Sequence, residues 1–196
     1  RMGLPVSKLV IATNVNDILA RTLATGRYEV GRVQPTLSPS MDIQISSNFE
    51  RLLFEAMERD ADQLRPAMQS LYQSGAFNLS KPAHAYIQKH FTAFRCDEDA
   101  TLQEISRTFL DTGQLIDPHT AVGRAAARAQ SRDPHIPMVT LATAHPAKFP
   151  DAVAKATGKH PALPPRYDTL ASLPERCATL PNDLQAVQNF IMANVT

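Results

Sequence analysis

The hydrophobic positions at the start of the chain form a short run that is followed by a helical spacing. Residues 8–13 (KLVIAT) are apolar and rich in β-branched side chains, which predicts a buried strand. Asn16 and Asp17 favour a helix start, and the apolar positions after them recur at helical spacing up to Gly26. A strand, a turn and a helix in this order form the unit from which parallel sheets are built.

The central part of the chain is dominated by helical patterns. Residues 47–50 (SNFE) and 101–104 (TLQE) have the spacing of a capping box, and an apolar stripe follows each of them. Residues 61–73 and 83–91 also show helical spacing. Gly75 is the predicted end of the helix at 61–73, and Gly113 is the predicted end of the helix that follows residues 101–104. Together these patterns predict a helical insertion over about residues 47–112.

The next part of the chain combines helices with a second strand. Residues 117–129 begin with Asp-Pro, an N-cap followed by a first-turn proline, and predict a helix. Residues 138–141 (MVTL) are apolar and β-branched and predict the second strand. Pro146 then opens a helix that we expect to stop near Gly158.

The C-terminal residues 159–196 are predicted to form a covering loop and a closing helix. Residues 161–181 are rich in proline and lack periodicity, which is typical of a loop. Residues 182–194 are amphipathic and predict a helix. We expect the inward face of this helix to consist of Leu184, Val187, Phe190 and Ile191.

Two clear strands among many helices indicate an α/β protein. Two strands are few for a parallel sheet that stands alone, so we expect partner strands to lie in another part of the protein. A chain without them would expose a sheet edge and apolar surface. Self-association of this polypeptide is therefore expected.

Composition and charge exclude several function classes. Twenty Lys and Arg residues against nineteen Asp and Glu residues give a formal charge of +1, which argues against a nucleic-acid or membrane-surface partner. The apolar runs are too short to span a bilayer. The two cysteines, Cys96 and Cys177, form no CxxC pattern and favour a reduced, cytoplasmic protein. The six histidines show no metal-ligand spacing, and no metal site is predicted.

Glycine is scarce and scattered along the chain. Seven glycines stand against fifteen prolines, and no two glycines are closer than five positions. The chain therefore lacks the glycine-rich turn at which a backbone usually approaches a phosphate. Its opening residues, Arg1-Met2-Gly3, are consistent with a tag remnant or with a chain cut from something longer.

Candidate chemistry lies where the two predicted strands end. Open α/β sheets bind ligands at the carboxyl ends of their strands. Residues 13–17 (TNVND) and 143–146 (TAHP) carry small polar side chains and lead into helices, whose N-termini attract anions. If the two strands are neighbours, the junctions form one rim of a pocket. The alternative is that Asn16, Asp17 and Thr143 only cap helices.

Two histidines near these junctions allow a structural and a chemical interpretation. His145 precedes a predicted helix, and His119 lies in residues 117–120 (DPHT). A histidine in such a place more commonly satisfies a backbone group than performs chemistry. Neither a GxSxG elbow nor a nucleophilic cysteine context is present. The residues alone thus define an α/β domain with a polar rim and no catalytic residue.

Four longer motifs at these rims resemble the threonine synthase family. They are residues 9–19 (LVIATNVNDIL), 37–54 (LSPSMDIQISSNFERLLF), 117–123 (DPHTAVG) and 141–149 (LATAHPAKF), and they occur in this order over about 140 positions. Four ordered motifs are far more specific than one short pattern. The resemblance is to the C-terminal portion of the family.

The resemblance implies the tryptophan synthase β-like fold (fold type II) of pyridoxal-phosphate enzymes, with this chain as the C-terminal part of the large domain. The implied reaction converts O-phospho-L-homoserine and water into L-threonine and phosphate, with pyridoxal 5′-phosphate (PLP) as cofactor. In the family, the Schiff-base lysine and the glycine-containing phosphate loop belong to the N-terminal part. The 196-residue fragment alone is therefore expected to be inactive, and no catalytic residue is assigned within it.

One cofactor-binding residue carries over from the resemblance. Thr143 corresponds to the Ser or Thr that faces the pyridine nitrogen of PLP in this fold type, and Thr140 is the alternative. A neutral hydroxyl does not hold a proton on that nitrogen as an aspartate would. The ring is then a weaker electron sink, which suits elimination and replacement chemistry.

The other polar residues of the motifs have no assigned contact, and structural support is an equally good interpretation for them. For His119, a place in a helix capped by Asp117 is the leading interpretation, and Arg51 fits a surface ion pair. The ligands of the substrate phosphate stay unassigned. The residues without an assigned contact are Asn14, Asn16, Asp17, Ser40 and Asp42.

Two other functions remain open at this point. The chain could belong to another fold-type-II lyase or dehydratase-like enzyme with a different substrate, although residues 37–54 argue against this. It could also be a non-enzymatic binding or regulatory module that kept the fold and lost the anchoring lysine.

Overall fold

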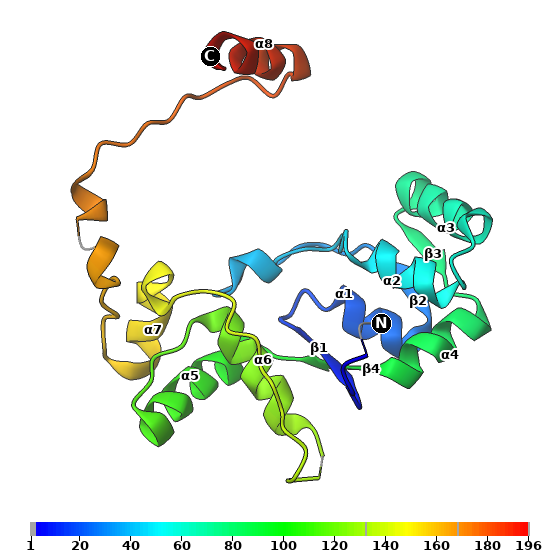
Figure 1. Ribbon diagram of the computed structural model, residues 1–196, viewed down its shortest axis with the longest axis horizontal. Helices are drawn as coiled ribbons and strands as arrows, with labels where there is room; N and C mark the ends of the chain where they lie inside the picture. Colours follow the sequence, from blue (N-terminus) through cyan, green and yellow to red (C-terminus); the bar gives the residue numbers. More distant parts are fainter. Residues whose placement is uncertain (1–2, 132, 168, 196) are drawn as a thin grey trace. The chain divides into compact units, whose positions relative to one another are not determined.

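The computed structural model describes residues 3–131, 133–167 and 169–195, and the chain divides into two units (Figure 1). Unit 1 comprises residues 1–162 and unit 2 comprises residues 163–196. Arg1 and Met2, which entered the expectation of a cut chain, lie outside the described residues.

Unit 1 consists of short strands surrounded by helices. Its strands are β1 (Leu9–Thr13), β2 (Arg27–Glu29), β3 (Ala76–Asn78) and β4 (Phe91–Arg95). Its α-helices are α1 (Ile18–Thr25), α2 (Phe49–Ala56), α3 (Ala61–Ser74), α4 (Lys81–His90), α5 (Glu98–Thr112), α6 (Pro118–Ala129) and α7 (Pro150–Thr157). The 3₁₀ turns η1 (Pro39–Met41) and η2 (Pro146–Lys148) complete the unit.

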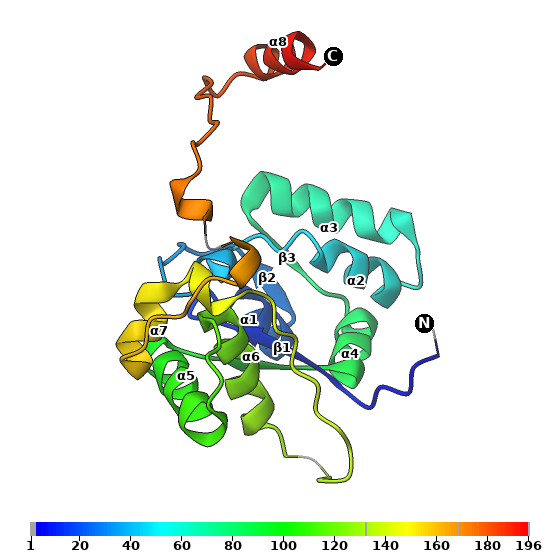
Figure 2. The same cartoon turned by 60° about the vertical axis from the view of Figure 1, so that its left-hand side comes forward.

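The strands pair in two small sheets. β1 and β4 are parallel, with Leu9 opposite Phe91 and Thr13 opposite Arg95. β2 and β3 are antiparallel. Helix α6 packs along β1, α5 packs on α6, and α7 packs on α5 (Figures 1 and 2). Helix α6 is therefore the element that brings its N-terminus toward the carboxyl end of β1.

The predicted second strand, Met138–Leu141, is wrong. Among the described residues this segment pairs with no strand, and Val139 and Leu141 are 78% and 74% exposed. A strand forms only where a neighbouring backbone completes its hydrogen-bond ladder, and an apolar run alone does not supply one. The neighbour of β1 is instead β4, which follows α4 without a break and has no separate signal in the pattern.

The two predicted capping boxes are also wrong, although helices lie at both places. Helix α2 begins after Asn48, whose side chain makes no capping bond. Helix α5 begins a turn earlier than residues 101–104, because Asp97 accepts a hydrogen bond from the backbone N–H of Ala100. Asp97 is a stronger N-cap than a threonine that lies one turn further on, where Thr101 donates its hydroxyl back to a carbonyl.

The predicted helix ends at glycine are confirmed. Gly26, Gly75, Gly113 and Gly158 follow α1, α3, α5 and α7 with φ values of 74°, 72°, 72° and 69°. This left-handed conformation costs glycine little because it has no Cβ. The N-cap predicted at Asp117 is confirmed as well, since its side chain accepts from the backbone N–H groups of His119 and Thr120.

Residues 47–112, which the pattern describes as a helical insertion, also supply two strands. The segment contains α2 to α5 together with β3 and β4. β3 completes the small sheet with β2, and β4 completes the sheet with β1. The segment is thus built into both sheets of unit 1.

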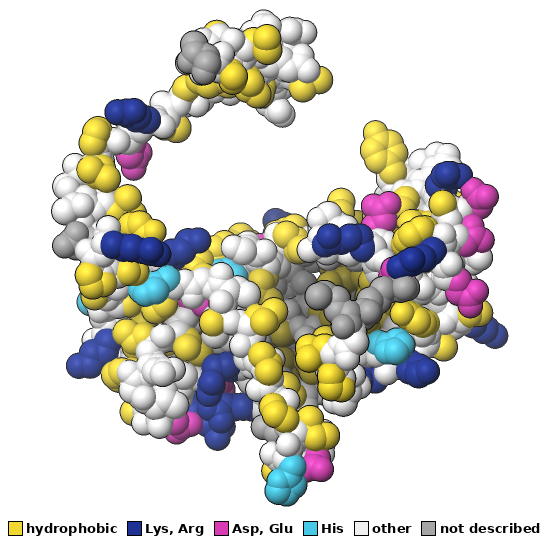
Figure 3. Space-filling view, in the orientation of Figure 1, with side chains coloured by type: hydrophobic (Ala, Val, Ile, Leu, Met, Phe, Trp, Pro, Cys, Tyr) yellow, Lys and Arg dark blue, Asp and Glu magenta, His cyan; other side chains and the backbone are white. Residues whose placement is uncertain are grey.

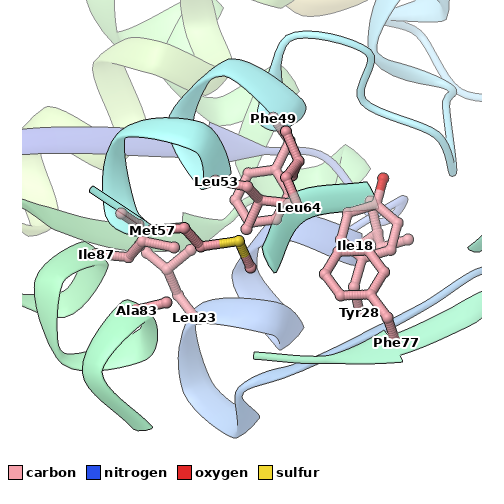
Figure 4. Packing of buried hydrophobic residues seen from close by; sticks show 11 residues of the cluster. Ile18, Leu23, Tyr28, Phe49, Leu53, Met57, Leu64, Phe77, Ala83 and Ile87 are labelled. Carbon is pink, nitrogen blue, oxygen red and sulfur yellow. The ribbon is translucent and has the colours of Figure 1, made fainter. Parts of the chain in front are cut away.

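The hydrophobic core of unit 1 lies between α1, α2, α4 and the β2–β3 sheet (Figure 4). Tyr28 is 1% exposed and stacks on Phe49 and Phe77, with ring centroids 5.4 and 5.0 Å away. Its hydroxyl accepts a hydrogen bond from the backbone N–H of Ser46 at 2.9 Å, which satisfies the polar end of a buried ring. Leu53 is fully buried beside them, and burial of such a side chain contributes about 2 kcal/mol.

Unit 2 contains the 3₁₀ turns η3 (Pro165–Tyr167) and η4 (Leu170–Ser172) and the helix α8 (Leu184–Asn194). The predicted closing helix is present as α8, but its predicted inward face is wrong. No residue of α8 is buried, and Phe190 and Ile191 are 40% and 50% exposed. Hydrophobic side chains are visible on α8 in Figure 3. An amphipathic pattern predicts a helix, whereas burial requires an opposing surface.

The described helices are all shorter than a membrane span. The longest, α5, has 15 residues. None of the helices in the described ranges is both long enough and apolar enough to cross a bilayer.

Candidate functional site

The residues that follow β1 are tied to the loop of residues 34–42 by a buried hydrogen-bond network. The Asp42 carboxylate is its centre. Its Oδ1 accepts from Asn14 Nδ2 at 2.7 Å, from Asn16 Nδ2 at 3.0 Å and from the Thr36 hydroxyl at 2.6 Å. Its Oδ2 accepts from the backbone N–H of Thr36 at 2.8 Å. One carboxylate thereby closes the loop and attaches it to the end of β1.

In Asn14 and in Asn16, both the oxygen and the nitrogen of the side-chain amide form hydrogen bonds. Asn14 Oδ1 accepts from the backbone N–H of Asn16 at 2.8 Å. Asn16 Oδ1 accepts from the backbone N–H of Gln34 at 2.8 Å, and its Nδ2 donates to the Gln34 carbonyl at 2.8 Å. Each amide is only 3% exposed. For Asn14, Asn16 and Asp42 the contacts therefore support the structural interpretation.

Asp17 holds α1 to β4 and does not cap a helix. It occupies the N-cap position of α1 but makes no side-chain capping bond. Its carboxylate instead accepts from Arg21 Nε at 2.9 Å and forms an ion pair with Arg95, with Nε and Oδ2 3.3 Å apart. Both arginines are about half exposed, so these ion pairs contribute only a few tenths of a kcal/mol each. The predicted capping role of Asp17 is wrong.

At the N-terminus of α6, Asp117 is fully buried and uses both carboxylate oxygens. Its Oδ1 accepts from the backbone N–H of His119 at 2.9 Å and lies 2.8 Å from His119 Nδ1. Its Oδ2 accepts from the backbone N–H of Thr120 at 3.3 Å and from the Thr120 hydroxyl. The side chain that caps the helix thus also orients two of its first residues.

His119 links this helix to the loop of residues 34–42. Its Nε2 accepts from the backbone N–H of Ser40 at 3.2 Å. Because a backbone N–H can only donate, Nε2 carries no proton in this arrangement, and Nδ1 donates to Asp117. The ring is 9% exposed and lies against Phe149, with ring centroids 4.6 Å apart. His119 is therefore fully occupied by structural contacts, as the leading interpretation expected.

Thr143 lies beside the same helix end. Its backbone N–H donates to the Thr120 hydroxyl oxygen at 3.3 Å. The residue is exposed, and within the described part of the chain its own hydroxyl has no hydrogen-bond partner. The interpretation of Thr143 as a helix cap finds no support, since η2 is capped by His145.

Thr140, the alternative to Thr143, is turned toward α6. A Cβ placed on Gly123 of α6 would lie only 3.0 Å from the Thr140 methyl carbon. Glycine at this position therefore permits the close approach of the two segments. With its methyl group packed against the helix, Thr140 is the less accessible of the two threonines.

His145 satisfies a backbone group, as its place before a helix predicted. Its Nδ1 accepts from the backbone N–H of Ala147 at 3.2 Å. Lys148 lies 6.0 Å from the centroid of the Phe149 ring, whose other neighbour is His119. The segment that follows Thr143 is thereby anchored next to the start of α6.

Hydrogen bonds link the two junctions, although the condition of the prediction, two neighbouring strands, is not met because Met138–Leu141 is no strand. A continuous set of contacts leads from Asn14 through the 34–42 loop to His119, Asp117, Thr120 and Thr143. Sequence reasoning missed Thr120 and the link from Ser40 to His119. The DPHT motif is the signal that could have pointed to Thr120, because a threonine three residues after an Asp N-cap can reach its carboxylate.

Other reactive groups of the chain are remote from this rim or occupied. Burial raises the pKa of the Cys96 thiol and keeps it protonated. Lys8 Nζ donates to the carbonyls of Gln88 and Lys89 at 2.9 Å each. Among the described residues no group of three His, Cys, Asp or Glu side chains is arranged to hold a metal. The rim therefore offers hydroxyl and backbone groups to a ligand.

A cavity of about 560 Å³ lies elsewhere in unit 1, between α3 and β3. Arg27, Ser70 and Asn78 are among its lining residues. It shares no lining residue with the network around Asp42 and Asp117. Arg27 is moreover paired with Glu29, with Nη2 and Oε1 2.9 Å apart.

Comparison with known proteins identifies relatives for this arrangement. The sequence model of a family described as threonine synthase, C-terminal, matches residues 120–191. The threonine synthase of Pseudomonas aeruginosa is 44% identical over 97% of this chain, which spans 41% of that protein. The threonine synthase of Saccharomyces cerevisiae is 38% identical over 96% of the chain, which spans 40% of it.

Solved structures give the same result. The PLP-bound threonine synthase from Brucella melitensis superposes with a TM-score of 0.91 and 49% identity, over 98% of this chain and 41% of that chain. The threonine synthase from Escherichia coli superposes with a TM-score of 0.71 and 29% identity, over 99% of this chain and 39% of that chain.

These similarities define first a class and then a family. The fold is the C-terminal part of the tryptophan synthase β-like fold, fold type II, as the resemblance implied. The chain is similar, over nearly its whole length, to the C-terminal part of threonine synthases, and it spans about two fifths of the length of the relatives that it matches.

Proposed function

We propose that the chain forms the C-terminal part of a PLP-dependent threonine synthase, a lyase that converts O-phospho-L-homoserine and water into L-threonine and phosphate. The observation that carries this proposal is the convergence of four family motifs on one rim, where Thr143 presents an unpaired hydroxyl. The 49% identity to a PLP-bound threonine synthase supports it further.

The residues present at the rim fit PLP. Thr143 is exposed and held by its backbone, so its neutral hydroxyl is available to hydrogen-bond the pyridine nitrogen of the cofactor. Bound PLP supplies an electron sink for charge that develops on the α-carbon of the substrate. A threonine does not hold a proton on the pyridine nitrogen, which moderates that sink. Thr140 is the alternative partner.

The saturated network around Asp42 has a supporting role in this proposal. It fixes the loop of residues 34–42 at the rim without offering free donors. The substrate phosphate therefore needs cationic partners from outside this network. Together, units 1 and 2 are proposed to form one C-terminal region of the large domain.

The 196-residue polypeptide by itself is expected not to turn over phosphohomoserine. The family's Schiff-base lysine matches no lysine of this chain, and PLP chemistry of this class depends on that anchor.

We also propose a cytoplasmic location, supported by two free cysteines. Self-association of the isolated polypeptide is proposed because Val139 and Leu141 are exposed.

The test is an assay of the full natural polypeptide that carries these residues, supplied with PLP. Phosphate release from O-phospho-L-homoserine, with no turnover of homoserine, supports the proposal. Turnover of a different substrate in place of phosphohomoserine would identify another fold-type-II lyase. Absence of PLP binding would indicate a binding module.

Thr143→Ala provides the matched test of the cofactor contact, and Thr143→Ser is its control. Loss of the hydroxyl should lower kcat about tenfold and shift the absorption band of bound PLP, whereas serine keeps the hydroxyl and the band. If Thr140→Val shifts the band and Thr143→Ala does not, the contact belongs to Thr140.

A further inference from the structure

The N-terminus of α6 determines where the Thr143 backbone lies. Asp117 engages His119 with one carboxylate oxygen and Thr120 with the other. The two side chains then reach different loops, because His119 accepts from Ser40 and Thr120 accepts from Thr143. One fully buried carboxylate thus connects both loops of the rim.

We propose that Thr120, oriented by Asp117, is a positioning residue that fixes the backbone of Thr143 and thereby the place of the Thr143 hydroxyl. The inference rests on the proposed function, in which that hydroxyl contacts PLP. In this inference Thr120 acts through Thr143.

The direction of the Thr120 hydroxyl follows from its two partners. A carboxylate can only accept, so the single hydroxyl proton of Thr120 goes to Asp117 Oδ2. The hydroxyl oxygen is then left to accept from the Thr143 N–H at 3.3 Å. Without the carboxylate the hydroxyl could rotate and donate elsewhere. Asp117 therefore sets the orientation on which the Thr143 contact depends.

The position of the Thr143 backbone depends on this hydrogen bond, because the segment before it forms no β-sheet hydrogen bonds that would hold it in place. Residues Met138–Leu141 pair with no strand in the described part of the chain, and Val139 and Leu141 are exposed. The bond to Thr120 ties Thr143 to α6, while Thr120 is itself only 5% exposed and rigidly held. Displacement of a positioned group by about 1 Å can lower a rate about a hundredfold. Loss of the bond should thus affect the cofactor contact.

The experiment uses the full natural polypeptide loaded with PLP and compares Thr120→Val with Thr120→Ser. Valine is nearly isosteric and removes both hydrogen bonds, whereas serine keeps the hydroxyl. We expect Thr120→Val to shift the PLP absorption band and to lower kcat about 10- to 100-fold. Thr120→Ser should restore both the band and kcat to near wild type.

Thr22→Val serves as the matched control. Thr22 is also a buried helical threonine, and its hydroxyl donates to the Ile18 carbonyl at 2.7 Å within its own helix, not to Asp117, Thr120 or Thr143. The same chemical change there should leave the absorption band unchanged. A band shift in Thr22→Val equal to that in Thr120→Val would show a general structural effect and overturn the inference.

A double-mutant cycle tests whether Thr120 acts through Thr143. In the Thr143→Ala background, Thr120→Val should cause no further band shift, because the group that it positions is gone. Fully additive effects would contradict the inference, as would a Thr120→Val protein with a wild-type band and kcat.

Amide hydrogen exchange separates this inference from the proposed function. Thr120→Val should accelerate exchange of the Thr143 N–H, and Thr120→Ser should not. If the wild-type protein binds no PLP but the exchange result holds, the proposed function fails while the positioning contact stands. Unchanged exchange in Thr120→Val overturns the contact itself.

Discussion

The two loops that meet at the start of α6 are held in opposite ways. In the loop of residues 34–42, Asp42 alone collects four hydrogen bonds, and Asn14 and Asn16 are almost fully buried beneath it. In the segment of residues 138–143, Val139 is 78% exposed, and the Thr143 hydroxyl has no partner within the described residues. A polar group whose hydrogen bonds are all made within the protein stabilises the structure. An exposed polar group on a backbone that is fixed by a hydrogen bond is available to a ligand.

The strongest test of the scaffold side is Asp117→Ala. This change leaves the Thr120 hydroxyl, His119 Nδ1 and two helix N–H groups in the interior without their acceptor. It should lower the free energy of unfolding by about 4 kcal/mol. Denaturant titration of the full natural polypeptide measures it. Asp62→Ala, at a side chain 87% exposed, should leave the unfolding curve in place. Equal curves for both variants would show that the Asp117 network adds no stability.

Leu53→Ala measures the stability contributed by the apolar core, against which the contribution of the Asp117 network can be compared. Leu53 is fully buried beside Phe49 (Figure 4), and its truncation should lower the free energy of unfolding by about 3 kcal/mol. Leu110→Ala is the control, since Leu110 is 79% exposed on α5 and should change stability little. The same denaturant titration serves, and a larger loss in Leu110→Ala would place the core elsewhere.

Asp42→Ala tests the loop directly. It removes the acceptor of four hydrogen bonds at a partly exposed site, and we expect a loss of about 2 kcal/mol in unfolding free energy. Limited proteolysis within residues 34–42 should become faster while cleavage elsewhere does not. A loop that resists protease as in the wild type would show that Asn14 and Asn16 hold it without the carboxylate.

The smallest effect on stability is expected at Thr143. Thr143→Ala removes a hydroxyl that has no partner in the described residues, so the free energy of unfolding should change by less than about 0.5 kcal/mol. Thermal denaturation without PLP measures this. A loss as large as that of Asp42→Ala would mean that the hydroxyl belongs to the scaffold, and the contrast between the two loops would disappear.

Local signals predicted much of the fold. The Asp-Pro start of α6 and the glycines after α1, α3, α5 and α7 lie where the pattern placed them, because caps act within one turn of the backbone. His145 also followed its local rule. Thr13–Asp17 and Thr143 were predicted to meet at one rim, and the contacts through Ser40, His119 and Thr120 bring them together.

The errors arose where long-range partners decide the outcome. Met138–Leu141 has the composition of a strand but no neighbouring backbone within the described chain, while β4 forms because β1 lies beside it. Residues 101–104 match a capping box, yet Asp97 starts the helix a turn earlier. The face of α8 is amphipathic, but in the described residues nothing buries it.

By itself, the sequence determined most helices, their glycine ends, the Asp117 cap and the family motifs, because these depend on neighbours a few residues apart or on ordered residue identity. Only the tertiary structure decided that Asp117 joins two loops, that Asn14 and Asn16 are saturated and that the Thr143 hydroxyl is not. The hydrogen bonds that join these loops link groups 18 to 79 positions apart in the chain, as in Asn16 with Gln34 and Ser40 with His119. No local pattern records such a separation.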